Sequence, residues 1–394
     1  MKRSVILGYA RTPFGKLGGV LAKVPAVELG AVAVREALKR SGAAPEDIDM
    51  AVMGQVISAG CGQIPGRQAV IKAGIPTRVP VDSINKVCAS SMRAVSMADQ
   101  VIRAGDARCI VAGGMENMSS VPFAMPDFRW GHKMFDAKVV DLMVKDGLWC
   151  PAYDRHMAVH GGIVAHEYGI TREEQDRWAL RSQKKAVEAI SNGYIEREIV
   201  SVTIGEGAFC IKDEAPRSNV SMETLARLKP IFSEENTVTA GNAPGCNDGA
   251  SALIVAEEEY AVKMGYSVEA TIIGHAMVSE GPQNIATAPG HAIQKLLLKT
   301  GFRIEDIDLF EINEAFAAVT LVSSKIIQCD LEKVNVNGGA IAFGHPLGAS
   351  GGRIIMTLIS ELQRRDARYG IAAICSGMGQ GDAILVENVK YLGT

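Results

Sequence analysis

The chain has 394 residues, of which 47% are hydrophobic and 22% are charged, with a net charge of -3. This is the composition of a folded globular protein, and at roughly 150 residues per domain its length suggests two or three domains. The charge balance, without a run of Lys and Arg, argues against nucleic acid as the main partner. No uncharged apolar run approaches the ~20 residues that a membrane span needs, so no membrane segment is expected.

The eight cysteines are spread along the chain, and no C-x-x-C pair occurs. Neither a zinc site nor a thioredoxin-like motif is therefore indicated. A chain of this length with few cysteines does not need disulfides for stability, so reduced thiols and a cytoplasmic location are expected.

Strands and helices are expected to alternate along the chain. Strand-like apolar runs lie at 4–10, 50–56, 80–85 and 109–114, and again at 270–276, 309–313, 333–338 and 370–377. Amphipathic, helix-like runs lie at 27–42, 171–190 and 291–302. Such alternation predicts an α/β fold with mostly parallel strands and helices on both faces of the sheet.

The sequence repeats itself at almost one offset. EDID occurs at 46–49 and again at 305–308, and CASSMRA from Cys88 matches GASGGRI from Gly348, 260 residues further on. Two matches in order predict a duplication that gives two α/β halves. The first half would comprise 1–118 and 248–267, and the second 268–394. Residues 119–247 match neither half and are expected to form an inserted loop domain.

Cys88 follows a predicted strand and stands at the start of a predicted helix. A helix N-terminus carries partial positive charge and free N–H groups, and both favour the thiolate. The alternative is a buried, inert cysteine. In the duplication Asn85 matches His345, which lies in the glycine-rich segment 337–353, so a thiol and an imidazole are predicted to face each other. Such a pair is the minimum for an activated thiolate.

Two further segments carry candidate chemistry. Cys375 ends a predicted strand and precedes Gly377, Gly379 and Gly381. The backbone N–H groups of such a turn are suited to binding an oxyanion. Asn313 and Glu314 stand between apolar runs at a strand-to-helix transition, where Asn is also a good N-cap.

The segments NKVCAS, NEAFA, GGAIAFGHPLGASG and CSGMGQG, together with TVTAGNAPGCNDGA, resemble the thiolase family over essentially the whole chain, and most closely its short-chain biosynthetic members. The resemblance implies a layered αβαβα fold with a loop domain, assembled as a homo-oligomer, a tetramer in particular. It implies an acyltransferase of lipid metabolism that condenses two acetyl-CoA to acetoacetyl-CoA and CoA, and that catalyses the reverse thiolysis. Coenzyme A thioesters would be the substrates, with no cofactor and no metal.

The resemblance also implies roles for single residues. Cys88 would be acylated, His345 would activate it, and Cys375 would move the α-proton. Asn313 would hold a water beside His345, and the N–H groups of Cys88 and Gly377 would form an oxyanion hole. The coenzyme A and acyl contacts would be Leu148, His156, Met157, Arg217, Thr224, Leu228, Phe232, Ala240, Pro244, Ala315 and Phe316, with Met157 shortening the acyl pocket.

Three residues depart from the family pattern. Pro244 stands where the family often has Ser, and Ser91 and Met378 stand where Gly is common. These changes concern coenzyme A affinity and substrate range rather than the reaction.

Alternative functions remain open at the level of the sequence. They are a thiolase for longer 3-ketoacyl-CoA, a decarboxylating ketoacyl synthase, and a non-catalytic subunit of the same fold. The presence of Cys88, His345 and Cys375 disfavours the non-catalytic subunit, and Cys375 disfavours the synthase. The segment GCGQIPG at 60–66 lacks dinucleotide-loop spacing. His156, His160 and His166 lack further ligands at metal-site spacing.

Overall fold

The computed structural model describes residues 2–391. The strands nearer the N-terminus are β1 (Ser4–Arg11), β3 (Met50–Gly54), β4 (Val81–Ile84), β5 (Cys109–Asn117) and β12 (Asn247–Glu257). Those nearer the C-terminus are β13 (Ala270–Ser279), β14 (Leu309–Ile312), β15 (Tyr369–Ser376) and β16 (Gln380–Asn388). In spatial order they run β4-β3-β5-β12-β1-β13-β16-β15-β14, and β1 pairs with β13 over three residues, Ser4 to Ile6.

The strand order is the same on both sides of the β1–β13 contact. Moving outward from this contact, the first group runs β1, β12, β5, β3 and the second runs β13, β16, β15, β14. In both groups the strand that comes first in the chain lies beside the strand that comes last, and the next two strands come from progressively earlier positions in the chain. This repeated order agrees with two similar halves. β4 and the two-residue strand β2 (Gly15–Lys16), which pairs with β12, have no counterpart among the described strands of the second group. The residue boundaries expected for the halves and the insertion stay predictions.

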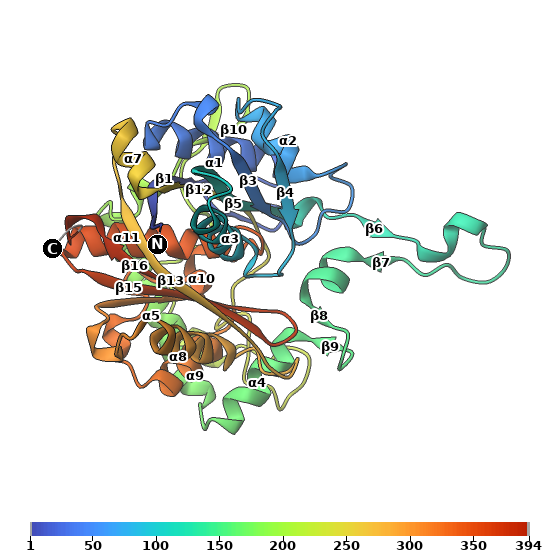
Figure 1. Ribbon diagram of the computed structural model, residues 1–394. Helices are drawn as coiled ribbons and strands as arrows, with labels where there is room; N and C mark the ends of the chain where they lie inside the picture. Colours follow the sequence, from blue (N-terminus) through green and yellow to red (C-terminus); the bar gives the residue numbers. More distant parts are fainter. Residues whose placement is uncertain (1, 392–394) are drawn as a thin grey trace.

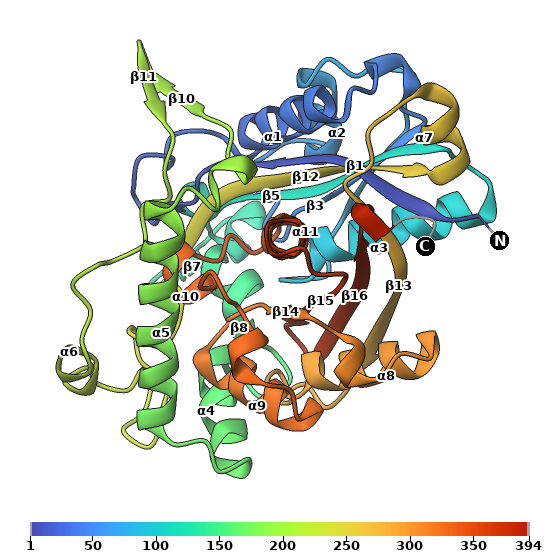
Figure 2. The ribbon, with the colours of Figure 1, turned by 90° about the vertical axis from the view of Figure 1, so that its left-hand side faces the viewer.

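Helices cover both outer faces and fill the space between the two groups of strands (Figure 2). On the outside of the first group lie α1 (Ala26–Ser41) and α2 (Pro65–Lys72), and on the outside of the second lie α8 (Ala288–Thr300) and α9 (Ala317–Ile327). Between the two lie α3 (Ser90–Ala104) and α11 (Ser350–Arg365). The layered αβαβα arrangement is therefore confirmed.

The sheets are mixed, so the expectation of mostly parallel strands is wrong. Only β3–β4, β3–β5 and β14–β15 are parallel, while β12 and β16 run antiparallel to every strand that they pair with. These two strands were not predicted. β16 returns directly after β15 through a short turn, and β12 returns after the long insertion, so neither needs the crossover helix that parallel pairing requires.

The strand expected at 333–338 does not form. Residues Leu331–Lys333 make a 3-10 helix, and only a single bridge joins Phe310 to Val334. The Asn335 side chain accepts a hydrogen bond from the Ile312 N–H and donates one to the Ile312 carbonyl, each at 2.8 Å. Asn335 has a φ of 47°, which lies outside the range of a β-strand. Its side chain therefore occupies the edge of β14 where the strand is expected.

The insertion has little sheet of its own. It contains the helices α4 (Met157–Glu167), α5 (Arg172–Ser191) and α6 (Met222–Ala226). It also has three two-stranded pairs: β6–β7, β8 (Trp149–Cys150) with β9 (Arg155–His156), and β10 (Val202–Gly205) with β11 (Ala208–Cys210). Residues 123–141, which include β6 (Phe123–Ala124) and β7 (Val140–Asp141), project as an arm away from the layers (Figure 1). No helix among residues 2–391 is long and apolar enough to cross a membrane.

The first turns of α3 and α11 touch in the middle layer. A Cβ at Gly351 would lie 2.5 Å from the Met92 nitrogen, so only glycine fits at this contact. The Gly352 N–H donates to the Ser91 hydroxyl at 2.9 Å. Cys88 and His345 stand just before these two helices, so this close contact brings the two halves of the predicted site together.

Candidate active site

A cavity of about 260 Å³ opens where the two halves meet the insertion. Of the residues predicted from the sequence, its walls contain Cys88, His345, Gly377, Leu148, His156, Met157, Ala240, Pro244, Ala315 and Phe316. The remaining wall residues are Val87, Met118, Gly147, Ile231, Ala243, Gly245, Cys246, Ile285 and Leu347. The lining is mostly apolar with a few convergent polar groups, which is typical of a small-molecule site.

Cys88 lies at the buried end of the cavity, two residues before α3 begins at Ser90. Burial raises the pKa of its thiol to about 12, although the backbone N–H groups of Cys88 and Gly377 near the sulfur act to lower it. The N–H groups act toward the thiolate as expected, but loss of water outweighs them, so the thiol is neutral at rest. The two N–H groups predicted to form an oxyanion hole do converge on this sulfur.

His345 is neutral, and its hydrogen bonds fix which nitrogen carries the proton. The Ser350 hydroxyl donates to the Pro346 carbonyl at 2.8 Å and lies 2.6 Å from His345 Nδ1. Since that hydroxyl has one hydrogen, it accepts from Nδ1–H, and Nε2 keeps its lone pair. Burial, followed by the charge of Arg353, lowers the pKa of His345 to about 3. Nε2 therefore presents a lone pair, and an imidazole this weakly basic takes a proton only where an anion that forms in the reaction stabilises the resulting imidazolium.

The glycines around His345 have a steric reason. Gly344 has a φ of 106°, and a Cβ there would lie 2.6 Å from the Asn247 side chain. That side chain accepts from the His345 N–H at 2.9 Å. The glycine therefore lets β12 come close enough to hold the backbone that carries the imidazole.

Asn313 is fully buried at the end of β14, beside the imidazole. Its Nδ2 lies 3.4 Å from His345 Nε2, and its Oδ1 has no hydrogen-bond partner among the described residues. It is not an N-cap, because α9 begins at Ala317 after Phe316. The amide is thus held beside His345, where its oxygen is able to accept a hydrogen bond from water.

Two buried carboxylates that the sequence did not single out for a role hold the turns around His345. Glu314 accepts from Trp178 Nε1 at 2.9 Å, Ser182 Oγ at 2.8 Å, Asn335 Nδ2 at 3.0 Å and the Ile341 N–H at 3.0 Å. It therefore joins α5, the turn after β14 and the glycine-rich segment. A charged residue between apolar runs was the only sequence signal for it.

Glu116, on β5, likewise holds the backbone near His345. Its carboxylate accepts from the N–H groups of Val56, Ile57 and Gly348 at 3.0–3.1 Å. Burial raises its pKa to about 7, with these N–H groups acting against that rise. It connects the loop after β3 to the backbone just after His345, and so links the two halves beside the cavity.

Cys375 is the next-to-last residue of β15 and is completely buried, outside the cavity wall itself. It packs in one apolar cluster with Met157, Ala315 and Phe316. Burial raises the pKa of its thiol well above the usual value, and the nearby Cys88 raises it further. Met378, in the turn that follows, has a φ of 66°. That conformation favours glycine, which is the residue common there in the family pattern.

The predicted coenzyme A contacts fall into two groups. Phe232 is 61% exposed and stacks on the His156 ring with 4.3 Å between centroids, at the rim rather than in the cavity wall. Arg217, Thr224 and Leu228 are not in the wall either. Thr224 caps α6 with Ser221, and the Leu228 carbonyl accepts from Arg172. Their roles stay predictions about a ligand that would extend outward.

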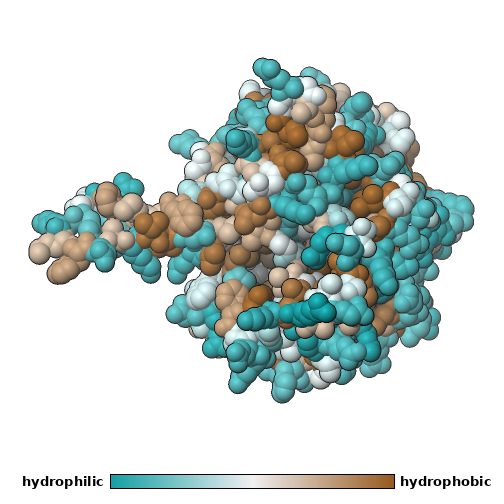
Figure 3. All heavy atoms as spheres, turned by 180° about the vertical axis from the view of Figure 1, so that it is seen from behind, coloured by the Kyte–Doolittle hydropathy of each residue, from teal (hydrophilic) through white to brown (hydrophobic). Residues whose placement is uncertain are grey.

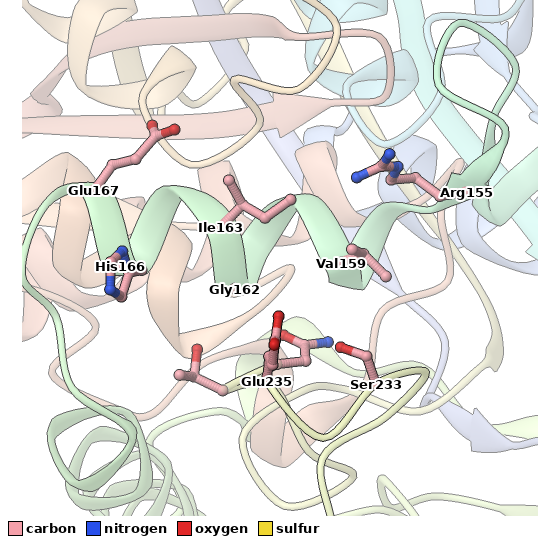
Figure 4. Close-up of a pocket in the computed structure, with 10 residues that line it drawn as sticks. Arg155, Val159, Gly162, Ile163, His166, Glu167, Ser233 and Glu235 are labelled. Carbon is pink, nitrogen blue, oxygen red and sulfur yellow. The ribbon is translucent and has the colours of Figure 1, made fainter.

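A larger hollow of about 710 Å³ lies elsewhere, between α4 and the loop 233–237 (Figure 4). His166 and Glu167 point to opposite sides of α4, and Ser233 and Glu235 approach from the loop. The groove has no thiol and no convergent polar set. Among residues 2–391 no group of three His, Cys, Asp or Glu side chains is placed to hold a metal.

Comparison with known proteins gives a consistent result. A thiolase N-terminal domain matches residues 4–259, and a thiolase C-terminal domain matches 266–388. An acetyl-CoA acetyltransferase of Cupriavidus necator is 48% identical over 97% of this chain and 98% of its own length. One from Escherichia coli is 44% identical over 99% and 100%. The crystal structure of the acetyl-CoA acetyltransferase of Bacillus anthracis superposes with a TM-score of 0.96 at 40% identity, covering 99% of both chains.

Proposed function

The chain belongs to the thiolase family, a family of acyltransferases, and we propose that it is an acetyl-CoA C-acetyltransferase that condenses two acetyl-CoA molecules to acetoacetyl-CoA and CoA. The observation that carries this proposal is the convergence, in one cavity, of the Cys88 sulfur, the N–H groups of Cys88 and Gly377, and the neutral His345. The relatives named above support acetyl-CoA as the substrate.

In the first half-reaction the proton of Cys88 passes to His345 Nε2, and the resulting thiolate attacks the thioester carbonyl. The oxyanion of the tetrahedral intermediate accepts hydrogen bonds from the N–H groups of Cys88 and Gly377. The departing CoA thiolate takes the proton of Cys375. The products are acetyl-Cys88, CoA and a Cys375 thiolate, with His345 as an imidazolium. Because both thiols and the imidazole are neutral at rest, charge forms only during the reaction, when the bound substrate and the oxyanion-hole donors are there to stabilise it.

In the second half-reaction the Cys375 thiolate removes the α-proton of a second acetyl-CoA. The enolate oxygen accepts from His345 Nε2–H and from a water held by Asn313. The enolate carbon attacks acetyl-Cys88, and the Cys88 thiolate leaves and recovers the proton from His345. Cys375 holds the α-proton and returns it in the reverse direction, thiolysis. The α-proton is only weakly acidic, so the enolate needs these donors in a dry site.

Met157 limits the acyl chain that the site accepts. Its side chain is buried in the cavity wall and packs in the same cluster as Cys375. Met157→Ala should raise kcat/KM for longer 3-ketoacyl-CoA relative to acetoacetyl-CoA by roughly tenfold per added carbon pair, since a methylene in a pocket is worth about 1–3 kcal/mol. An unchanged chain-length profile, measured by thiolysis of a substrate series, would remove Met157 from the acyl site.

We further propose a cytoplasmic homo-oligomer, a tetramer in particular. The arm at 123–141 projects from the molecule with apolar side chains on its surface (Figure 3). Trp130 is 87% exposed and Phe135 is 92% exposed. Exposed apolar surface of this kind marks an interaction site. The edge strand β4 likewise has unpaired backbone groups on one side. All eight cysteines are free, which suits a reducing compartment.

The test is an assay of thiolysis on the purified chain. Loss of the acetoacetyl-CoA enolate absorbance on addition of CoA, together with a mass increase of one acetyl group on Cys88 after acetyl-CoA alone, is expected. A chain that binds acetyl-CoA without acetylating Cys88 would contradict the proposal. Sedimentation of full-length protein beside a variant with Trp130→Ser and Phe135→Ser tests the tetramer, which the variant should lose.

A further inference from the structure

The turn that carries Cys88 contains a strained residue directly before the nucleophile. Val87 has a φ of 46°, in the left-handed region where a β-branched side chain is an outlier. Such strain persists only where the surrounding contacts enforce it. The contacts of this turn therefore determine where the Cys88 sulfur and N–H point.

Some of the contacts that hold Val87 in this conformation come from the same turn. Asn85 Oδ1 accepts from the Val87 N–H at 2.8 Å. The Ser90 hydroxyl accepts from the Lys86 N–H at 2.8 Å and donates to the Val87 carbonyl at 2.7 Å. These bonds shape the turn, but all of them lie within six residues. They do not fix the turn relative to the second half of the chain.

Two contacts of Lys86 cross to the hairpin that carries Cys375. The Ser376 hydroxyl donates to the Lys86 carbonyl at 2.6 Å. Lys86 Nζ lies 2.6 Å from Asp382 Oδ2, with the two side chains 14% and 1% exposed. Asp382 stands on β16 opposite Ile374, the residue before Cys375. Gly377 packs on Val87, since a Cβ there would lie 3.3 Å from Val87 Cγ1.

We propose that the Lys86–Asp382 ion pair, together with the Ser376–Lys86 hydrogen bond, is a positioning device that holds the Cys88 turn in register with the Cys375–Gly377 turn. The inference rests on the proposed function, because the oxyanion hole takes one N–H from each turn. The two turns belong to different halves of the chain, so their separation is not set by local backbone geometry. Lys86 and Asp382 touch no reacting atom and act through Cys88 and Gly377.

The charges around Asp382 make the pair specific. Burial raises the pKa of this carboxyl, while Lys86 acts to lower it, and Arg93 and His275 act in the same direction. Lys86 is the partner that contacts this carboxylate and the largest contributor that lowers its pKa, so removal of Lys86 leaves a buried carboxylate without its ion-pair partner. The register of the two turns thus depends on an intact Lys86–Asp382 ion pair.

The central test is Asp382→Asn, which removes the charge and keeps the shape. We expect kcat for thiolysis to fall roughly 10- to 100-fold, as for a small misplacement of reacting groups, with KM for CoA changed less than about threefold. Single-turnover acetylation of Cys88 should slow by the same factor. Lys86→Met should behave alike, and the double variant should be no slower than the slower single variant. Asp382→Glu keeps the charge and should recover part of the rate.

The control is Glu387→Gln on the same strand. Glu387 is buried and pairs with Arg368 at 2.8 Å, at the other end of β16, and its loss should leave kcat within about twofold. A kcat within about twofold in both Asp382→Asn and Lys86→Met would overturn the proposal, as would a loss that only follows the unfolded fraction by circular dichroism. Should Asp382→Asn not fold, a normal kcat in Ser376→Ala would overturn it. An inactive wild-type chain would contradict the proposed function instead.

Discussion

The two strand-to-helix turns that meet at the cavity occupy equivalent places in the two halves and are held in different ways. The Cys88 turn is short and has no glycine, and a strained Val87 aims the sulfur. The His345 turn is long and rich in glycine, and the buried carboxylates Glu314 and Glu116 hold its backbone. The difference follows from the catalytic role proposed for the residue on each turn. A nucleophile must be fixed at one point, whereas the base must approach closely and keep its ring hydrogen-bonded.

The largest expected effect separates the two thiols. Cys88→Ala should abolish covalent acetylation and lower kcat by at least about 1000-fold, because no other group supplies the nucleophile. Cys375→Ala should still be acetylated by acetyl-CoA, more slowly because CoA departs without the Cys375 proton, but should not condense, since no group then removes the α-proton. Intact-mass measurement after mixing with acetyl-CoA distinguishes the two. A folded Cys375→Ala protein without acetylation would contradict this division of roles.

The second prediction removes Glu314, a buried carboxylate that holds the His345 turn. Glu314→Ala leaves four buried donors without their acceptor, and we expect the free energy of unfolding to fall by about 3 kcal/mol or more, with kcat lowered as well. Urea unfolding measures the stability. Glu332→Ala is the matched control, because that side chain is 76% exposed and its contact with Arg181 is a surface ion pair. Equal losses in the two variants would show that Glu314 supports nothing particular to this turn.

Ser350→Ala tests the protonation of the imidazole itself. Without the hydroxyl, Nδ1–H loses its acceptor and the imidazolium of the first half-reaction is less stable. We expect kcat to fall roughly 10- to 100-fold, as for other groups that orient a histidine, with little change in KM. Ser350→Thr keeps the hydroxyl and should retain more activity than Ser350→Ala. A Ser350→Ala enzyme with the wild-type kcat would mean that Ser350 does not orient the ring.

The smallest effect appears in the acid stability of the folded chain. His345 has a folded-state pKa of about 3, below the roughly 6.5 of an unfolded histidine. The unfolded chain therefore binds the proton first, so stability is full above about pH 6.5 and falls as the pH drops toward 3. His345→Gln should reduce the slope of unfolding free energy against pH in that window by up to about 1.4 kcal/mol per pH unit. His156, with a pKa of about 4, contributes similarly and remains in the variant. An unchanged slope in urea titrations at several pH values would show that His345 is not buried and neutral.

Much of the fold follows from short-range patterns. The runs at 4–10, 50–56 and 109–114 are strands, and those at 27–42, 171–190 and 291–302 are helices, as their periodicity predicts. The repeated phrases indicate two similar halves, and the strand order has that symmetry. The motifs also place Cys88, His345 and Gly377 in one cavity wall. Period and turn chemistry are properties of neighbouring residues, so they are visible in the sequence.

Tertiary structure decided the rest, because it depends on residues far apart in the chain. The directions of β12 and β16 follow from how they return to the sheet, and Asn335 occupies the edge where a strand was expected at 333–338. Burial, which is contributed by all the surrounding elements, leaves the Cys88 thiol neutral where the helix N-terminus alone predicts a thiolate. The partners of Glu314 come from three separate segments. The sequence therefore determined which groups are present, and the packing of distant segments determined their protonation and their partners.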